Sequence, residues 1–431
     1  MRIVLLELNE INFDAVRHYI SKGIKLPGFS KIIDAGLYTT SSESIYENLE
    51  PWIQWPSAHT GLTYEQHKVF RLGDFVNADH EQIFERIESK GFSVGAISPM
   101  NASNNLKRPA YFIPDPWTET KSDGSFLSRN ISSAISQAVN DNSQSKLTLS
   151  TIFSLILAFF IYVRPSRYID LFIYALSSLG RSWRKALFLD KFLHEIHLTK
   201  LKRSKPDFST LFLNAGAHIQ HHYFYNSDFV EDKSLKNPNW YIDESEDPFL
   251  EMLKVYDLIL SDLHSIKNLD LIVATGLSQS PYNEVKFYYR LKNHKKFLSD
   301  IGISFSNVVP RMTRDFLIKF DSPDDLVEAE EILSKIYIDE IKMFSEIDNR
   351  GNDLFVVLTY PKEITSQTKM HVDGKQYDLL ELVSFVAIKN GEHNPKGYLY
   401  LTKGIKKGVI KNNDHVSNIY NLIYESFVSG S

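Results

Sequence analysis

The stretch that decides the fold is RIVLLEL, residues 2–8, which runs directly into Asn9 and Glu10. Its apolar residues are almost uninterrupted, as is typical of a strand that helices cover on both faces of a parallel sheet. Ligands of open α/β sheets bind at the carboxyl ends of such strands. We therefore predict that this segment is a buried first strand and that Asn9 and Glu10 border a site.

Three more segments have the same character, and amphipathic stretches separate them. The expected strands are 92–97 (FSVGAI), 209–214 (STLFLN) and 270–275 (DLIVAT), and the expected helices include 81–90 and 246–267. Strands alternating with helical patterns predict an α/β layer fold with a largely parallel central sheet.

Composition narrows the function classes. The chain has 431 residues, 43% of them hydrophobic, which suits one large domain with insertions or two to three domains. A net charge of −5 gives no reason to expect nucleic acid as a partner, and the lack of cysteine excludes a thiolate metal site and a cysteine nucleophile. The N-terminus does not resemble a signal peptide, so we expect a cytoplasmic location or the inner face of a membrane.

Residues 121–205 interrupt the α/β pattern with an apolar, basic insertion. Residues 147–163 (LTLSTIFSLILAFFIYV) are seventeen residues without a charge, and YIDLFIYALSSLG (168–180) follows. Basic residues surround and follow both stretches. Three interpretations stay open: a buried helical cap, a hairpin at a membrane interface that gives peripheral contact through 147–205, or a membrane-spanning helix.

A second irregular region, 300–388, has a β-α-β order and predicts a small α+β subdomain. It contains FLIKF (316–320), an acidic helix at 323–336 and LFVVLTYP (354–361). The remaining segments, 1–120, 206–299 and 389–431, then form the core domain.

Histidines gather after the strand at 209–214. The segment NAGAHIQHHYF places Asn214, His218, His221 and His222 together, and His218 and His222 share a helix face. His393 lies in a loop before a later apolar strand. Such histidines bind zinc or a similar metal when a carboxylate joins them.

Several local patterns, in the same order, resemble the alkaline phosphatase superfamily, in particular its type I phosphodiesterase/nucleotide pyrophosphatase branch. They are LPGFSKIIDAGLYTT (26–40), HTGLTYEQHKV (59–69), IFERIESKGFSVGAI (83–97), PDFSTLFLNAGAHIQHH (206–222) and EHNPKG (392–397). The resemblance implies a layered α/β/α fold and a site with two metals, usually zinc, beside a Thr, Ser or Cys nucleophile.

This chain departs from that pattern at most site positions. Two aspartates of the family fall on Asn9 and Asn214, and the nucleophile falls on Pro51 or Gln54. The Asp and His of a later motif fall within 275–278, where both are missing. Two histidines are kept, at His218 and His393. A two-metal site is therefore not expected, and one divalent metal such as zinc remains.

From these positions we assign candidate site residues. The metal candidates are His218, His222 and His393, the catalytic candidates are Ser57, Glu10 and Glu50, and the substrate-binding candidates are Asn9, Gln54, His59 and Asn214.

Two main functions stay open, beside a different reaction such as glycosyl or sulfuryl chemistry with Glu7, Glu10 and Glu50 as general acid–base groups. One is a divergent phosphodiesterase, phosphatase or phospho-group transferase acting on a phosphate ester, for example a lipid-linked or surface-glycan intermediate. The other is a catalytically inactive or repurposed protein of the same scaffold that binds a ligand or partner in cell-surface polysaccharide or lipid metabolism.

Overall fold

The computed structural model describes residues 1–140, 149–311, 314–372, 374–405 and 410–428. The chain forms two compact units. Unit 1 comprises Met1–Glu231, Ser245–Ser280 and Gly391–Ser431, and unit 2 comprises Asp232–Glu244 and Pro281–Asn390.

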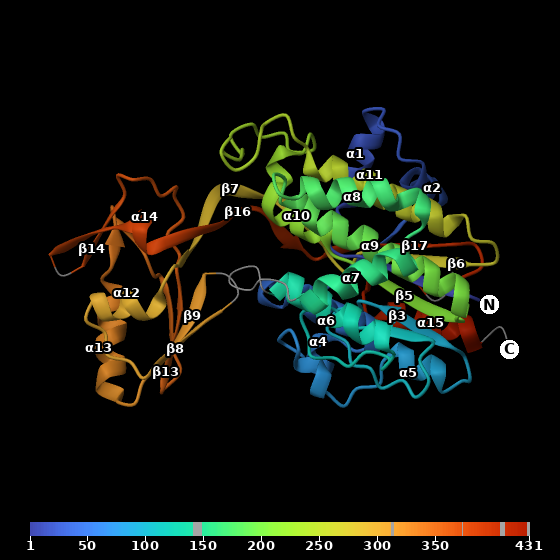
Figure 1. Cartoon of the computed structure of the whole chain (residues 1–431), viewed down its shortest axis with the longest axis horizontal. Coiled ribbons are helices and arrows are strands. Elements are labelled where there is room, and N and C mark those ends of the chain that lie inside the picture. Colours follow the sequence, from blue (N-terminus) through green and yellow to red (C-terminus); the bar gives the residue numbers. More distant parts are fainter. Residues whose placement is uncertain (141–148, 312–313, 373, 406–409, 429–431) are drawn as a thin grey trace. The chain divides into compact units, whose positions relative to one another are not determined.

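An eight-stranded sheet with the order β18-β2-β17-β6-β1-β5-β3-β4 forms the centre of unit 1 (Figure 1). The strands are β1 (Ile3–Leu8), β2 (Tyr38–Ser41), β3 (Val94–Ile97), β4 (Tyr111–Ile113), β5 (Phe208–Leu213), β6 (Asp270–Ala274), β17 (Lys396–Leu401) and β18 (Asp414–His415). β6, β1, β5, β3 and β4 run parallel, whereas β17 is antiparallel to both of its neighbours. The predicted α/β class with a largely parallel sheet is confirmed, with all four predicted strands.

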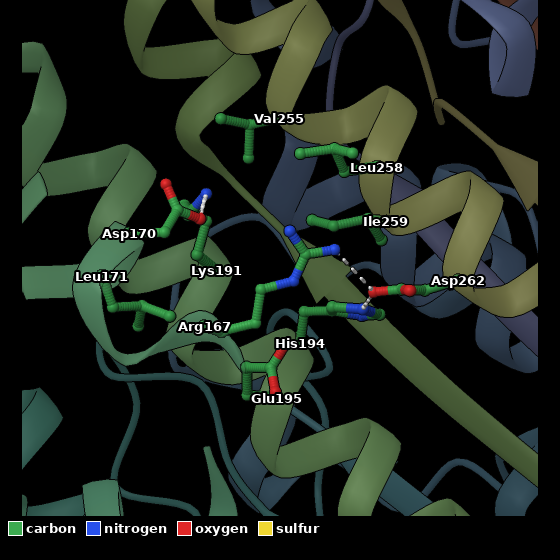
Figure 2. Close-up of a pocket in the computed structure, with 10 residues that line it drawn as sticks. All are labelled: Arg167, Asp170, Leu171, Lys191, His194, Glu195, Val255, Leu258, Ile259 and Asp262. Atoms are coloured by element: carbon green, nitrogen blue, oxygen red, sulfur yellow. Dashed lines mark hydrogen bonds and ion pairs between the residues drawn. The ribbon is translucent and has the colours of Figure 1, made fainter. Parts of the chain in front are cut away.

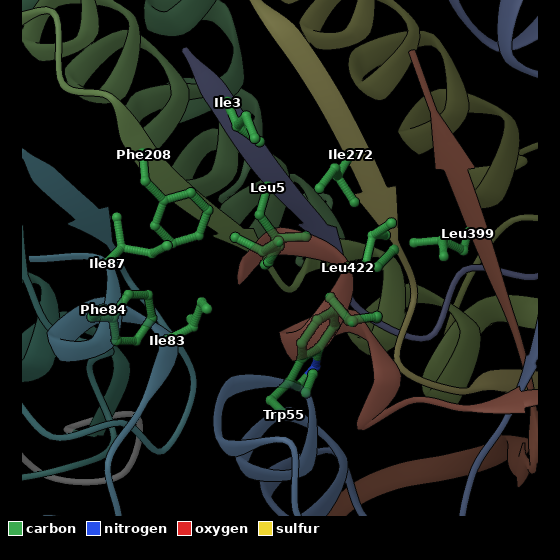
Figure 3. Close-up of a cluster of buried hydrophobic side chains, with 14 of the residues drawn as sticks. Ile3, Leu5, Trp55, Ile83, Phe84, Ile87, Phe208, Ile272, Leu399 and Leu422 are labelled. Carbon is green, nitrogen blue, oxygen red and sulfur yellow. The ribbon is translucent and has the colours of Figure 1, made fainter. Parts of the chain in front are cut away.

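The first strand is buried on both sides, as its apolar run predicts. Ile3 and Leu5 belong to a core cluster with Trp55, Phe84 and Leu422 (Figure 3). These partners come from α3 (Pro51–Thr60), α5 (Ile83–Glu88) and α15 (Asn418–Val428). Val4 and Leu6 alternate with Ile3 and Leu5, point to the other face and are equally buried.

A second group of helices consists of α9 (Trp183–Ser204), α10 (Ala215–Tyr223) and α11 (Pro248–His264). α9 packs on β5, and α10 and α11 pack on α9. The predicted helices at 81–90 and 246–267 correspond to α5 and α11. The other helices of unit 1 are α1 (Phe13–Ser21), α2 (Pro27–Ala35), α4 (Tyr64–His67), α6 (Phe126–Asn140), α7 (Leu149–Tyr162) and α8 (Tyr168–Ser177), with short 3-10 turns between some of them.

Unit 2 contains two four-stranded antiparallel sheets. One has the order β12 (Glu346–Asn349), β13 (Asp353–Val357), β9 (Asp315–Lys319) and β8 (Asn307–Pro310). The other has the order β11 (Ile341–Lys342), β10 (Tyr337–Ile338), β14 (Lys369–Val372) and β15 (Lys375–Asp378). The helices are α12 (His294–Asp300), α13 (Pro323–Ser334) and α14 (Leu379–Leu382).

Two long strands, β7 (Ser278–Leu291) and β16 (Val383–Asn394), pair with each other and run from unit 1 into unit 2. The longer segment of unit 2 therefore begins at Pro281, whereas the sequence analysis places residues 281–299 in the core domain, together with residues 232–244. The difference arises because β7 continues as one strand past the point where the chain leaves unit 1. Helices α6 to α9, which make up most of 121–205, belong to unit 1.

Candidate metal centre

The centre of the site is Glu10, which follows β1 and adopts a left-handed backbone with φ 63°. This conformation is unfavourable for a residue with a side chain and needs support from its surroundings. The Glu10 N–H donates to the carbonyl of Thr275 at 3.0 Å, and Gln220 Nε2 donates to the Glu10 carbonyl at 2.9 Å. These bonds fix Glu10 at the carboxyl ends of β1, β5 and β6.

Two imidazoles and two amides surround the Glu10 carboxylate. Its Oε2 lies 3.1 Å from His221 Nε2 and 3.3 Å from His393 Nε2, and it accepts a hydrogen bond of 2.5 Å from Gln279 Nε2. Its Oε1 accepts a bond of 3.1 Å from Asn9 Nδ2. One ligand atom each of Glu10, His221 and His393 lies within 4.8 Å of the other two, and these three residues are named the triad below.

Distant segments of unit 1 deliver these side chains. His221 comes from α10, directly after β5, while Gln279 and His393 come from the ends of β7 and β16 that belong to unit 1. Gly391 permits this approach, because a Cβ at that position would lie 2.0 Å from Gln279 Oε1 and 2.7 Å from the Gln220 carbonyl. The close packing of backbone and amide therefore requires a glycine.

Charge in the site is arranged around the buried Glu10. Burial opposes ionisation of Glu10, but the imidazoles of His393 and His221 outweigh it, so the pKa of Glu10 lies well below its usual range. Glu50, just before α3, lies with Oε2 3.8 Å from His393 Nδ1. Burial, with a smaller contribution from the negative charge of Glu10, raises the pKa of Glu50 to about 7 against the opposing effect of His393.

The triad fits a divalent metal such as zinc. Two imidazoles and one carboxylate are a donor set of catalytic zinc sites, which leave a fourth position open. The oxygen-to-nitrogen distances of 3.1 Å and 3.3 Å match the edge of a tetrahedron with metal–ligand bonds of about 2 Å. Asn9 and Gln279 donate to the same carboxylate and orient it, as outer-shell groups do in metal sites.

The structure brings His393 into the triad, but it places His218 and His222 elsewhere. Their rings lie 4.8 Å apart, and burial lowers the pKa of His218 to about 4 with a further effect from the charges of His221 and Lys185. Neither histidine belongs to the triad, and their assignment as metal ligands stays a prediction. The cluster of histidines in the sequence predicts a site in this region. The orientation of α10 about its axis determines that His221 is the histidine that contacts Glu10.

The two asparagines that align with family aspartates bind each other. Asn9 Nδ2 donates to Asn214 Oδ1 at 2.8 Å, and the indole Nε1 of Trp55 donates to Asn9 Oδ1 at 2.8 Å. Trp55 is fully buried, and its ring would lie 3.2 Å from a Cβ on Gly276. Neutral amides and an indole thus occupy the positions where the resemblance implies charged ligands.

Three candidates from the segment 50–61 lie in the protein interior, each with less than 1% exposure. Ser57 Oγ contacts the Ile53 carbonyl and lies 3.0 Å from His67 Nε2. Because Val69 N–H donates to His67 Nδ1, Nε2 carries the proton, so His67 does not act as a base for Ser57. The assignment of Ser57 as a catalytic residue stays a prediction, and the described hydrogen bonds give it no base.

The other two buried candidates also have protein partners. His59 Nε2 lies 3.0 Å from Glu7 Oε1, which also accepts from Thr210 Oγ1. Gln54 Nε2 donates to the Asn48 carbonyl at 2.8 Å. His59 and Gln54 are thus held by contacts within the protein, and their assignment to substrate binding stays a prediction. From this segment, Glu50 alone among the candidates extends toward the triad.

A second group of potential ligands, His194, Glu195 and Asp262, is an ion-pair network (Figure 2). Arg164 Nη2 lies 2.5 Å from Glu195 Oε1 and 2.6 Å from Asp262 Oδ2. His194 Nε2 and Arg167 Nη2 also approach Asp262, at 3.1 Å and 3.9 Å. Two guanidinium groups balance two carboxylates here, so this group has little excess negative charge for a cation.

No protein-family model matches the chain, and no curated protein matches it in sequence. Among solved structures, phosphonoacetate hydrolase from Sinorhizobium meliloti 1021 has a TM-score of 0.47 and 10% identity, over 99% of this chain and 96% of its own. Murine ectonucleotide pyrophosphatase/phosphodiesterase 5 has a TM-score of 0.43 and 11% identity, over 98% and 94%. A mutant of the alkaline phosphatase PafA has a TM-score of 0.44 and 12% identity, over 97% and 93%.

By name, these similar structures are a phosphonoacetate hydrolase, a nucleotide pyrophosphatase/phosphodiesterase and an alkaline phosphatase. Their TM-scores lie below 0.5, so they define no ligand, substrate or activity of this chain. The function is therefore argued from the triad and its neighbours.

Proposed function

We propose that unit 1 hydrolyses a phosphate ester with the help of one divalent metal held by Glu10, His221 and His393. The observation that carries this proposal is the contact of one buried carboxylate with two imidazoles at the carboxyl edge of the sheet. When bound, such a metal supplies positive charge that stabilises negative charge on phosphoryl oxygens.

The residues of the chain have distinct roles in this proposal. Asn9 and Gln279 hold the Glu10 carboxylate in one orientation. Because Pro51 and Gln54 provide no hydroxyl, water is the attacking group rather than a side chain. Glu50, beside His393, accepts the proton of that water or returns one to the leaving oxygen.

The proposed substrate is a phosphate ester of a lipid-linked or surface-glycan intermediate. Support comes from the apolar helices α7 and α8 and from the basic residues that lie between and after them, which belong to the same unit as the triad. A substrate with a lipid tail would be presented at a membrane surface, where a site on a peripheral protein can reach it.

The test is hydrolysis of bis-p-nitrophenyl phosphate and p-nitrophenyl phosphate by the full chain loaded with zinc. We expect turnover that is lost in His393→Ala and Glu10→Gln and kept in His222→Ala, which changes the same helix outside the triad. If the chain binds zinc but turns over neither phosphate nor sulfate esters, the proposal that unit 1 is a hydrolase is wrong.

One observation favours a second function, a binding protein without catalysis. Glu10 already has two imidazole and two amide partners, and Trp55 fills the half of the site where the resemblance implies further ligands. This alternative expects a ligand or partner from cell-surface polysaccharide or lipid metabolism, and it expects the same variants to change binding instead of turnover.

A further inference from the structure

Helix α7 exposes a stripe of large apolar side chains. Ile152, Ile156 and Phe160 follow one another at intervals of four residues, and Phe160 is 63% exposed. Residues at this spacing share one helix face. The buried residues Ala158 and Tyr162 lie on the side that packs against the rest of unit 1.

Helix α8 has a matching stripe. Ile169, Phe172 and Ile173 have exposures of 76%, 60% and 52%, whereas Leu171 of the same helix is buried. The two stripes meet at the turn between the helices, where the rings of Phe160 and Tyr168 lie 5.7 Å apart. These six residues, three on each helix, are named the apolar face. Soluble monomers rarely expose large contiguous apolar patches, and such patches usually mark an interaction site.

The apolar face is held in place from behind. Arg164, in the turn before α8, donates its backbone N–H and its guanidinium to Glu195 of α9 and also pairs with Asp262 of α11. Lys191 of α9 pairs with Asp170 of α8 at 2.5 Å (Figure 2). Because these ion pairs fix the inner side of the hairpin, its outward exposure is a property of the fold rather than of a frayed helix.

Basic residues outnumber acidic residues in the sequence around the hairpin. Residues 149–205 contain ten basic and three acidic residues, and five of the ten basic residues pair with carboxylates, including Glu246, Glu251 and Asp262 outside this segment. Lys202, Arg203 and Lys205 are exposed at the end of α9, and Arg203 Nη2 donates to the Ile161 carbonyl at 3.4 Å. A cationic cluster therefore borders the end of α7.

No single helix within the described ranges is long and apolar enough to cross a membrane. The pair Thr151–Tyr162 and Pro165–Ser177 meets the length and composition requirement together, but it is bent by 119°. Such a pair suits the plane of a membrane interface, with apolar side chains among the acyl chains and basic residues among the headgroups.

We propose that the apolar face docks the protein on the surface of an anionic lipid bilayer. Charge favours this partner over a second copy of the chain, because two copies would bring their basic segments together, whereas anionic lipids attract them. The proposal goes beyond the hydrolase and does not depend on the triad.

The test is co-sedimentation of the full chain with vesicles of phosphatidylcholine alone or mixed in equal parts with phosphatidylglycerol. We expect binding to the mixed vesicles, and Phe172→Asp should weaken it by at least roughly tenfold, since it removes a large inserted side chain. Val327→Asp is the matched control, because Val327 is 61% exposed on α13 of unit 2. Thermal unfolding should be the same for both variants.

A charge-reversed variant, Lys202→Glu with Arg203→Glu, should also lose most of its binding to the mixed vesicles, and high salt should have the same effect on the unaltered chain. Failure of the unaltered chain to bind mixed vesicles would overturn the proposal. Equal loss of binding in Phe172→Asp and Val327→Asp would also overturn it, as would a stable dimer in sedimentation that Phe172→Asp dissociates.

Discussion

Glu10 Oε2 lies 3.1 Å from His221 Nε2, where Glu10 follows strand β1 and His221 lies in α10, the helix after the neighbouring parallel strand β5. Glu10 is almost fully buried, while the side chain of His221 is 32% exposed. The pair thus joins a carboxylate fixed in the interior to an imidazole that a ligand can reach. His393 completes the triad on the same carboxylate oxygen.

Glu50→Gln should reduce turnover of a phosphate diester by roughly a hundredfold, because loss of a general acid–base group typically costs at least that factor. Zinc content should stay unchanged, since Glu50 is outside the triad. The measurement is kcat by steady-state kinetics beside metal analysis of the same sample. Unchanged kcat at full zinc content would remove Glu50 from the proposed mechanism.

Asn9→Asp should destabilise the metal-free protein by about 1–3 kcal/mol, since the amide donors to Glu10 and Asn214 are lost and a second carboxylate faces Glu10. Chemical denaturation in the presence of a chelator measures this change. Asn226→Asp, at another partly buried asparagine of unit 1, is the comparison substitution. Equal stability of Asn9→Asp and the unaltered chain would contradict the described hydrogen bonds.

Asp190 predicts a pH dependence of stability. It is fully buried beneath α10, where it accepts hydrogen bonds from Tyr256 Oη and the N–H groups of Asn214 and Ala215. Burial, opposed by these bonds, raises its pKa to about 6 from 3.8. Because the folded state binds this proton more tightly than the unfolded state, the contribution of Asp190 to stability is greatest below pH 4 and is lost as pH rises to about 6.

The substitution Asp190→Asn tests whether the contribution of Asp190 to stability falls as pH rises. The free energy of unfolding of the variant relative to the unaltered chain should rise between pH 4 and pH 7, by up to about 3 kcal/mol for a shift of about two pKa units. Urea unfolding at several pH values provides the measurement. A difference that is constant with pH would mean that Asp190 titrates at its ordinary value in the folded protein.

The sequence predicts the parallel core well, for a physical reason. Strands such as RIVLLEL are buried on both faces, and an almost uninterrupted apolar run in the sequence follows from this burial. Glu10 was identified for the same reason, since polar residues at the end of a buried strand lie at the sheet edge. β17 corresponds to the apolar strand expected after His393, whereas β2 is not predicted as a strand.

The sequence does not predict which histidine of α10 contacts Glu10. His218, His221 and His222 lie within one helix, and the packing of α10 on α9 and α11 decides which one faces Glu10. Gln279 and Gly391 gave no signal, because their roles arise where β7 and β16 return to unit 1. Ser57 is a candidate because it lies near a site motif, whereas its burial within α3 becomes visible only in the tertiary structure.

The central claim is that Glu10, His221 and His393 bind one metal ion. The most direct test is the zinc content of the purified full chain after incubation with zinc and removal of free metal, for the unaltered protein and for His221→Ala and His222→Ala. The triad predicts one zinc per chain in the unaltered protein and in His222→Ala, and none in His221→Ala. Absence of zinc from the unaltered chain, or loss in His222→Ala with retention in His221→Ala, would contradict the claim.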